Sequence, residues 1–138
     1  MFKKFVLAFF FLCLLAKADL IISPDSLPEN TKQFLSTNFK AQVGMAQRDG
    51  NSFEVYLTDG TELEFDIMGN WKEIDSKFTP INFSILPANI AAIIQNQFPN
   101  TFLLEAERKI NYYKIKLSNR LELKIDANGT ILSQEFDD

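Results

Sequence analysis

The chain has 138 residues, of which 46% are apolar and 13% aromatic, so it can form the core of one domain or two small ones. It contains no histidine and a single cysteine, Cys13. These counts exclude a Ser-His-Asp triad, a Cys-His dyad, a Cys/His zinc site, haem ligation and a disulfide framework.

The first residues have the parts of a secretory signal peptide. Lys3 and Lys4 precede an apolar run over residues 5–16, and Ala16-Lys17-Ala18 matches an A-x-A cleavage pattern. The run is shorter than the roughly 20 residues that a membrane-spanning helix needs. We therefore predict a signal peptide over residues 1–18, cleaved before Asp19. An uncleaved membrane anchor is the alternative.

The expected mature chain is acidic. Cleavage removes three lysines, the cysteine and no acidic residue, so the formal net charge changes from −4 to −7. An exported domain without disulfides is typical of the bacterial periplasm, and secretion is the alternative. Nucleic acid is excluded as a partner because phosphate binding needs a basic patch. We expect no stable membrane anchor after cleavage.

After an N-terminal segment over residues 19–26, the sequence contains an internal repeat. Leu27-Pro28 returns as Leu86-Pro87 at an offset of 59, and from the following strands onward the offset is 60. The two copies are predicted to be a first repeat over residues 27–85 and a second over residues 86–138.

Each copy begins with a helix, because proline suits the first turn and apolar residues then recur at helical spacing as far as Phe39 and Phe98. The pattern next changes to a period of two, which predicts strands with one buried and one wet face. The expected inward residues are Phe53, Val55, Leu57, Leu63, Phe65 and Ile67 in the first copy, and Tyr113, Ile115, Leu117, Leu121, Leu123 and Ile125 in the second.

Weaker strands are expected around residues 42–48, 71–75, 102–107 and 131–136, on either side of each hairpin. The predicted fold class is therefore α+β: two tandem repeats of a helix and an antiparallel sheet, with the helices on one face of the sheet.

These motifs resemble those of the PepSY-like, beta-lactamase-inhibitor-like family of exported bacterial proteins. The resemblance extends over nearly all of residues 27–138, and its most specific segment is FDIMGNW at residues 65–71. In the second copy this segment reads IDANGTI. The resemblance implies a beta-lactamase-inhibitor-like fold of tandem helix-plus-sheet repeats, similar to an inhibitor that grips an enzyme with the exposed face of its sheet. It implies no catalytic residues.

Two acidic motifs could suggest calcium binding or acid–base catalysis, but a structural interpretation explains each of them. Asp126, Asn128 and Gly129 match positions of a calcium-binding loop, but Lys124 stands where the first carboxylate ligand is required. We expect a glycine turn in which aspartate caps its own backbone. Glu62, Glu64 and Asp66 alternate along one strand, which favours a solvated face over acid–base catalysis. No enzyme activity, cofactor or metal is predicted.

The sequence favours a protein-binding module, an inhibitor or regulator of an envelope enzyme, with an unidentified envelope protein as partner. The outward side chains would supply the binding face, acidic in the first copy and more basic in the second. Trp71 is assigned either to the core or to this face. The candidate partner-binding residues are Glu54, Tyr56, Glu62, Glu64, Asp66, Trp71, Lys114, Lys116 and Lys124.

Two further possibilities stay open at this stage. A small-ligand carrier would use a groove between the two copies, and an accessible apolar groove would favour it. Asn128 lies in an Asn-x-Thr sequon with Asp126 two residues before it, so it is a candidate glycosylation position in a host with periplasmic glycosylation. The alternative is that Asn128-Gly129 serves only the turn. The oligomeric state is not predicted.

Overall fold

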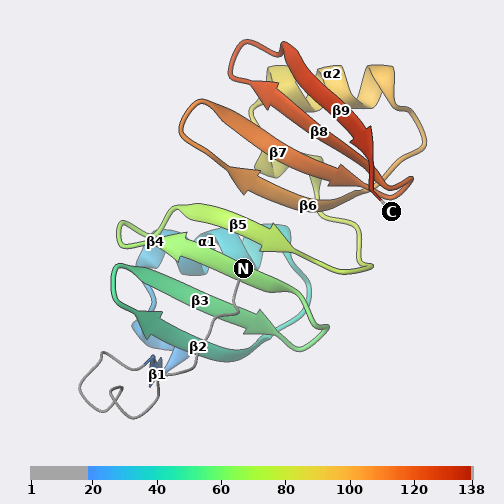
Figure 1. Ribbon diagram of the computed structural model, residues 1–138. Coiled ribbons are helices and arrows are strands. Elements are labelled where there is room, and N and C mark those ends of the chain that lie inside the picture. The colour runs from blue at the N-terminus through green and yellow to red at the C-terminus, as the bar shows by residue number, and fades with distance from the viewer. Residues whose placement is uncertain (1–18, 138) are drawn as a thin grey trace, which may run out of the picture.

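The computed structural model describes residues 19–137, which form a nine-stranded antiparallel sheet with two helices against it (Figure 1). The strands are hydrogen-bonded in chain order from β1 to β9. Helix α1 (Glu29–Asn38) follows β1, and α2 (Ala88–Gln97) lies between β5 and β6. The strands are β1 (Leu20–Ile22), β2 (Val43–Asp49), β3 (Ser52–Leu57), β4 (Glu62–Asp66), β5 (Trp71–Asp75), β6 (Leu103–Arg108), β7 (Tyr112–Leu117), β8 (Leu121–Asp126) and β9 (Ile131–Phe136).

The α+β class is therefore shown, and a helix followed by four antiparallel strands occurs twice along the chain. The predicted signal peptide lies outside the described residues. Within residues 19–137, no helix is long and apolar enough to cross a membrane.

Both helices begin in the same way. A 3-10 turn, η2 (Pro24–Ser26) or η3 (Phe83–Ile85), precedes a proline that occupies the N-cap position. Proline has no N–H group, so its use where the helix begins removes one backbone donor that would have no partner within the helix. Both helices end at an aromatic residue, Phe39 or Phe98, whose N–H group donates to the carbonyl one turn earlier.

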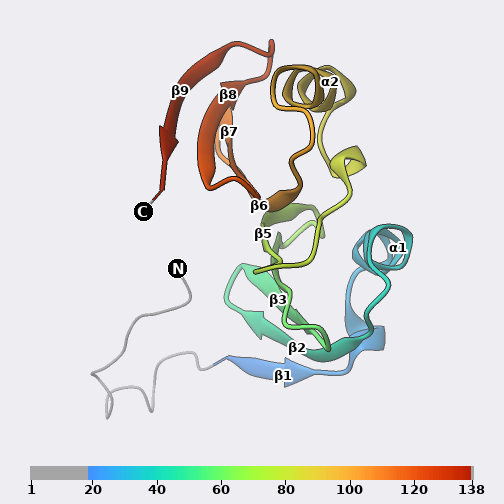
Figure 2. The same cartoon turned by 90° about the vertical axis from the view of Figure 1, so that its right-hand side faces the viewer.

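The two halves are joined through the sheet, because β5 pairs with β6. Both helices lie on the same face of the curved sheet (Figure 2). The core lies between this face and the helices: Leu35, Ile90 and Ile94 from the helices are buried with the inward residues of the strands. The Phe34 ring packs edge-on against Phe65 with their centroids 5.8 Å apart.

Each helix is fastened to the turn that connects the last two strands of its half. The Asn30 side chain donates to the Met68 carbonyl oxygen at 3.0 Å, and the Asn89 side chain donates to the Ala127 carbonyl oxygen at 3.0 Å. The first half has an additional buried bond, from the Thr31 hydroxyl to the Gly69 carbonyl oxygen at 2.8 Å. The first turn of each helix thus holds the turn below it.

The structure corrects three expectations. Ile67, expected to be buried, is 43% exposed because β4 ends at Asp66 and the next residues form a turn. Tyr113 is only half-buried. The segment over residues 19–26 contains a strand that pairs with β2, although it was given no structure in the sequence analysis. A strand of three residues is too short for a reliable periodicity signal.

Candidate protein-binding face

The face of the sheet opposite the helices, here called the open face, has no helix against it among residues 19–137 (Figure 2). Its side chains are those that alternate with the buried residues of the strands. Because all nine strands pair in chain order, outward side chains from neighbouring strands stand directly opposite one another. The open face is therefore a set of rows that run across the strands.

One row places four carboxylates on four consecutive strands. The strand register pairs Glu54 with Glu64, Glu64 with Glu73, and Glu73 with Glu107. Neighbouring strands are about 4.8 Å apart. Like charges directly opposite each other destabilise a sheet, so this row is an electrostatic cost to the fold.

A second row repeats the pattern two residues further along the strands. The register pairs Glu62 with Asp75 and Asp75 with Glu105. Together the two rows make the carboxylate array, defined here as Glu54, Glu62, Glu64, Glu73, Asp75, Glu105 and Glu107.

The charge changes at β7. Glu107 is paired with Lys114 and Glu105 with Lys116, and Lys114 is in turn opposite Lys124 on β8. Glu122 lies beside these lysines and forms an ion pair with Lys114 at 3.7 Å. The open face is therefore strongly acidic over β3–β6 and of mixed charge over β7–β8.

Lysines compensate only part of the array. Glu64 pairs with Lys72 at 3.6 Å, Lys77 lies 3.3 Å from Glu62 and 3.5 Å from Asp75, and Lys109 lies 2.8 Å from Glu107. These side chains are partly exposed, so each pair contributes at most about 1 kcal/mol. Among the described residues, no ion pair is formed by Glu54, Glu73 or Glu105.

The three carboxylates without an ion pair also have raised pKa values. Burial, followed by the charges of Glu107 and Glu64, raises the pKa of Glu73 to about 7. Burial and the charges of Asp19 and Asp49 raise the pKa of Glu54 to about 7. Burial and the charge of Asp75 raise the pKa of Glu105. Burial is the largest cause in each case, and a pKa of about 7 leaves Glu54 and Glu73 only partly ionised at neutral pH.

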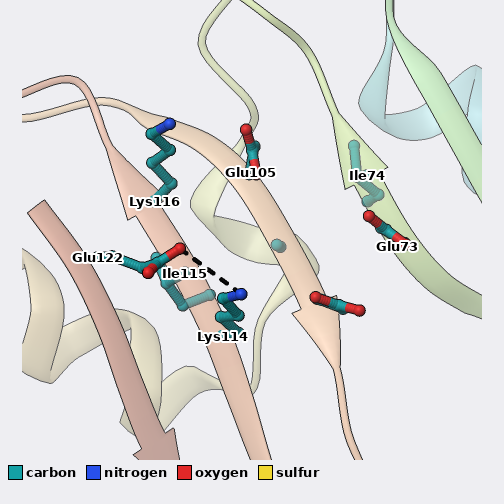
Figure 3. Close-up of a pocket in the computed structure, with 9 residues that line it drawn as sticks. Glu73, Ile74, Glu105, Lys114, Ile115, Lys116 and Glu122 are labelled. Atoms are coloured by element: carbon teal, nitrogen blue, oxygen red, sulfur yellow. Dashed lines mark ion pairs between the residues drawn. The ribbon is translucent and has the colours of Figure 1, made fainter. Parts of the chain in front are cut away.

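A hollow of about 200 Å³ lies where the two halves of the sheet meet. Figure 3 shows Glu73 on β5 and Glu105 on β6 at one side of it, and Lys114, Lys116 and Glu122 at the other. Buried Ile74, Ala106 and Ile115 also line the hollow. Acidic and basic side chains thus surround a depression over β5, β6 and β7.

The residues predicted for the binding face differ in how exposed they are. Glu62, Glu64, Asp66, Lys114, Lys116 and Lys124 are half-buried outward residues, as is Tyr56. Glu54 also points to the open face, but it is only 8% exposed and accepts a hydrogen bond from the Tyr56 hydroxyl at 3.4 Å.

Trp71 does not belong to the open face. It is 7% exposed and is paired with Phe65 on the helix side, because a bulge in the β4–β5 pairing shifts the register. Its ring lies 6.2 Å from that of Tyr113, and the Arg108 guanidinium lies 4.9 Å from its centroid. Its burial supports the core interpretation of Trp71 over that of an exposed anchor for a partner.

The sequence analysis missed four members of the array: Glu73, Asp75, Glu105 and Glu107. The signal was present, because both pairs alternate with Ile74 or Ala106 inside segments that were expected to be strands. Their importance depends on which strands are neighbours, and the sequence pattern does not show that β5 pairs with β6.

The two acidic turns bind their own backbone. Asp66 Oδ1 accepts the N–H groups of Met68 and Asn70, each at 2.9 Å. Asp126 Oδ1 accepts those of Asn128 and Thr130 in the same way. The contact with the helix explains why the turn needs glycine: a Cβ on Gly69 would lie 2.4 Å from Asn30 Oδ1. The turn interpretation accounts for the whole motif, and Asn128 lies exposed within the second turn.

One acidic cluster among the described residues has the composition of a cation site. The carboxylate oxygens of Asp19, Asp49 and Glu54 lie within 4.8 Å of one another. Such oxygens are the ligands that calcium prefers. The pKa of Asp19 is also raised, by burial and by the adjacent Asp49 charge.

A groove of about 350 Å³ lies on the helix side, where the two halves meet. Its lining is largely polar and includes Asn30, Asn38 and Arg108 beside Phe34 and Ile85. This position is the one expected for a small-ligand carrier. The lining of the groove is therefore mixed, whereas a mainly apolar lining would favour a carrier.

A model of the family described as "Putative beta-lactamase-inhibitor-like, PepSY-like" matches residues 51–133. A solved structure from Bacteroides thetaiotaomicron, titled a "putative calcium-regulated periplasmic protein", is 34% identical, with a TM-score of 0.79 over 85% of this chain and 96% of that chain.

A "putative periplasmic protein" of the DUF2874 family from Bacteroides vulgatus is 30% identical, with a TM-score of 0.80 over 87% of this chain and 98% of its own. A second "putative periplasmic protein of unknown function" from that species is 26% identical, with a TM-score of 0.73 over 86% of this chain and 99% of its own. No curated protein matches the chain. The family match, together with these relatives, shows that the chain belongs to the PepSY-like, beta-lactamase-inhibitor-like family.

Proposed function

We propose that the protein is a non-enzymatic, protein-binding module of the periplasm that uses the open face of its sheet to bind, and thereby inhibit or regulate, an envelope protein. The carboxylate array is the observation that carries this proposal. It places like charges opposite one another across four strands, an arrangement that opposes folding. A partner that supplies opposite charge would turn this cost into binding energy and orientation.

The periplasmic location is supported by the titles of the relatives and by the signal-peptide pattern of residues 1–18. We further propose that the mature chain begins at Asp19 and that its two halves are tandem repeats. Intact mass spectrometry of protein from the native envelope is expected to give the mass of residues 19–138. A mass that includes Met1 would contradict cleavage.

Site-specific photo-crosslinking tests the binding proposal. A photoreactive side chain is placed at Lys116 or Glu122 on the open face, and at Ser36 or Gln95, exposed on the helices, as matched controls. We expect covalent protein adducts in native envelopes from the first pair and none from the second. Adducts from the helix positions only, or from no position, would contradict protein binding by the open face.

The second candidate function is that of an envelope small-ligand carrier, and the groove beside Arg108 is the observation that favours it. Polar side chains and one guanidinium would suit a small anionic ligand better than an apolar one. Native mass spectrometry of protein purified under mild conditions would reveal a bound small molecule. Replacing Arg108 with glutamine should abolish that adduct.

Glycosylation of Asn128 is a separate proposal, supported by the exposed turn in which this residue lies. It requires a host with the corresponding transferase. The measurement is the intact mass of wild-type and Asn128→Gln protein from that host. A wild-type mass without a glycan increment would contradict glycosylation, and Asn128 would then serve only the turn.

A further inference from the structure

We propose that the carboxylate array binds a basic segment of the partner protein, with arginine or lysine side chains entering the hollow between Glu73 and Glu105. This inference rests on the proposed function and specifies the chemistry of the partner at the same face. Three features of the described residues support it: the acidic charge of the array, the residues that line the hollow and the spacing of the two rows.

The excess charge is not required by the fold. Glu54 and Glu64 face each other on β3–β4, whereas Lys114 and Lys124 face each other at the corresponding place on β7–β8. Both pairs stand beside fully buried apolar pairs, so either charge is compatible with the same sheet. The accumulation of acid over β3–β6 therefore needs a reason other than folding, and electrostatic complementarity to a partner provides one.

Two carboxylates without an ion pair in the described part of the chain face the hollow, and Lys114 and Lys116 line its other side. Glu73 and Glu105 line it from adjacent strands, and neither forms an ion pair among residues 19–137. Both are partly desolvated, which strengthens their attraction to an entering cation. A guanidinium group can donate hydrogen bonds to two carboxylates at once, so arginine suits the site best.

The spacing of the rows matches an extended segment. Members of the two rows on one strand, such as Glu73 and Asp75, are two residues apart, which corresponds to about 6.6 Å along the strand. Alternate side chains of an extended peptide have the same spacing. A segment with basic residues at every second position, lying along β5 and β6, would therefore meet both rows.

A metal ion fits the array less well than a peptide. Calcium needs six to eight oxygen ligands at about 2.3–2.6 Å, and side chains that project in parallel from a sheet do not converge on one point. The carboxylates that do converge, Asp19, Asp49 and Glu54, lie at one end of the array. Calcium binding is therefore an alternative that the experiment below distinguishes from peptide binding.

The experiment measures binding of a fluorescent peptide of alternating arginine and alanine to the exported protein purified from the periplasm. The test variant is Glu73→Gln with Glu105→Gln. The matched control is Asp25→Asn with Glu29→Gln, which removes two carboxyl groups from exposed positions on the helix side. We expect the test variant to bind roughly tenfold more weakly and the control to bind like wild-type protein.

Thermal unfolding separates this role from a structural one. Removing two like charges from the array should leave the melting temperature unchanged or raise it, even as peptide binding weakens. Equal weakening in the control would show unspecific attraction to an acidic protein and overturn the proposal. So would the absence of peptide binding to wild-type protein.

Two other outcomes would assign the array to a different occupant. Calcium that raises the melting temperature of wild-type protein but not of the test variant, without peptide binding, would indicate a metal site. If the wild-type protein is a dimer and the test variant is a monomer, the occupant of the array is a second copy of the chain. If photo-crosslinking captures a partner through the open face equally well in the test variant, the basic-segment proposal fails and the protein-binding proposal stands.

Discussion

The two halves of the open face have the same architecture and different charge. In the first half, Glu54 and Glu64 stand opposite each other, and in the second half Lys114 and Lys124 do so. The residues next to them on the buried side remain apolar, with Val55 opposite Leu63 and Ile115 opposite Leu123. The comparison shows that the core requires apolar inward residues, whereas the outward charges can be chosen for another purpose.

The helix side shows a second difference between the halves. The turn at Gly69 is packed against Asn30 and Thr31, while the turn at Gly129 has the side chain of Ile93 above it. Both glycines have positive φ angles, of 87° and 89°. The first turn is thus held by polar contacts with little room to adjust, and the second lies beneath a flexible apolar side chain.

The largest expected effect comes from testing this difference in the turns. Gly69→Ala should reduce the free energy of unfolding by about 2–4 kcal/mol, because the new Cβ would collide with Asn30 Oδ1 and Thr31 Oγ1 at an unfavourable φ. Gly129→Ala should cost about 1–2 kcal/mol, because the end of Ile93 can rotate away. Urea denaturation measures both. Equal losses would show that the backbone angle alone determines the effect.

The second prediction concerns the acidic half of the open face. Glu62→Lys with Glu64→Lys should weaken partner capture by roughly tenfold at low salt, because charges at an interface steer association. The free energy of unfolding should change by only about 0.5 kcal/mol, since lost pairs with Lys77 and Lys72 are offset by relief of repulsion in the array. Surface plasmon resonance at several salt concentrations and urea denaturation provide the two measurements. Undiminished capture at low salt would show that the acidic strand is not part of the binding surface.

The third prediction follows from the pKa of Glu73, which is raised from an ordinary value of 4.5 to about 7. The folded state binds this proton more tightly than the unfolded state, so the contribution of Glu73 to stability is fully present below pH 4.5. It is lost as the pH rises from 4.5 to about 7, and it does not change further above that.

Glu73→Gln should therefore flatten the decline in the free energy of unfolding between pH 4.5 and 7. The measurement is the difference between wild-type and variant stability across this window, because carboxylates distant from Glu73 contribute equally to both proteins. Glu29→Gln, at an exposed helix position, serves as the control. A parallel decline in wild-type and Glu73→Gln protein would show that Glu73 has no raised pKa.

The smallest expected effects test the helix contacts that the two halves share. Asn30→Ala and Asn89→Ala each remove one side-chain hydrogen bond to a turn carbonyl, so each should lower the free energy of unfolding by about 1 kcal/mol. The loss at Asn30 should be the smaller, because the Thr31 hydroxyl still holds Gly69. Chemical denaturation of the two variants decides this, and a smaller loss at Asn89 would reverse the proposed order.

Local patterns predicted most of the secondary structure. Leu-Pro before an amphipathic run located both helices, and alternation located β3, β4, β7 and β8 to within about one residue, because these signals depend on residues close in sequence. The same alternation was wrong at Ile67, where capping by Asp66 ends the strand and turns the chain. The helix contact that requires Gly69 comes from a residue far away in the sequence and has no local signal.

The candidate site was predicted only in part. Outward residues of the clear strands were identified correctly, but Trp71 was left between the core and the binding face, because a bulge in the β4–β5 pairing decides which side it takes. Glu73 and Glu105 were overlooked because their importance arises from standing near each other across the junction of β5 and β6.

The sequence by itself determined the α+β class, the buried and outward positions of the regular strands, and the acidic character of the chain, since each depends on composition or short-range periodicity. The tertiary structure decided that the two halves share one sheet and that seven carboxylates form a continuous array on it. The physical reason is that strand pairing is a long-range choice: the register across β5 and β6 depends on backbone hydrogen bonds and core packing between segments about 30 residues apart. Only that register sets acidic side chains opposite one another and forms the hollow that we assign to a basic partner.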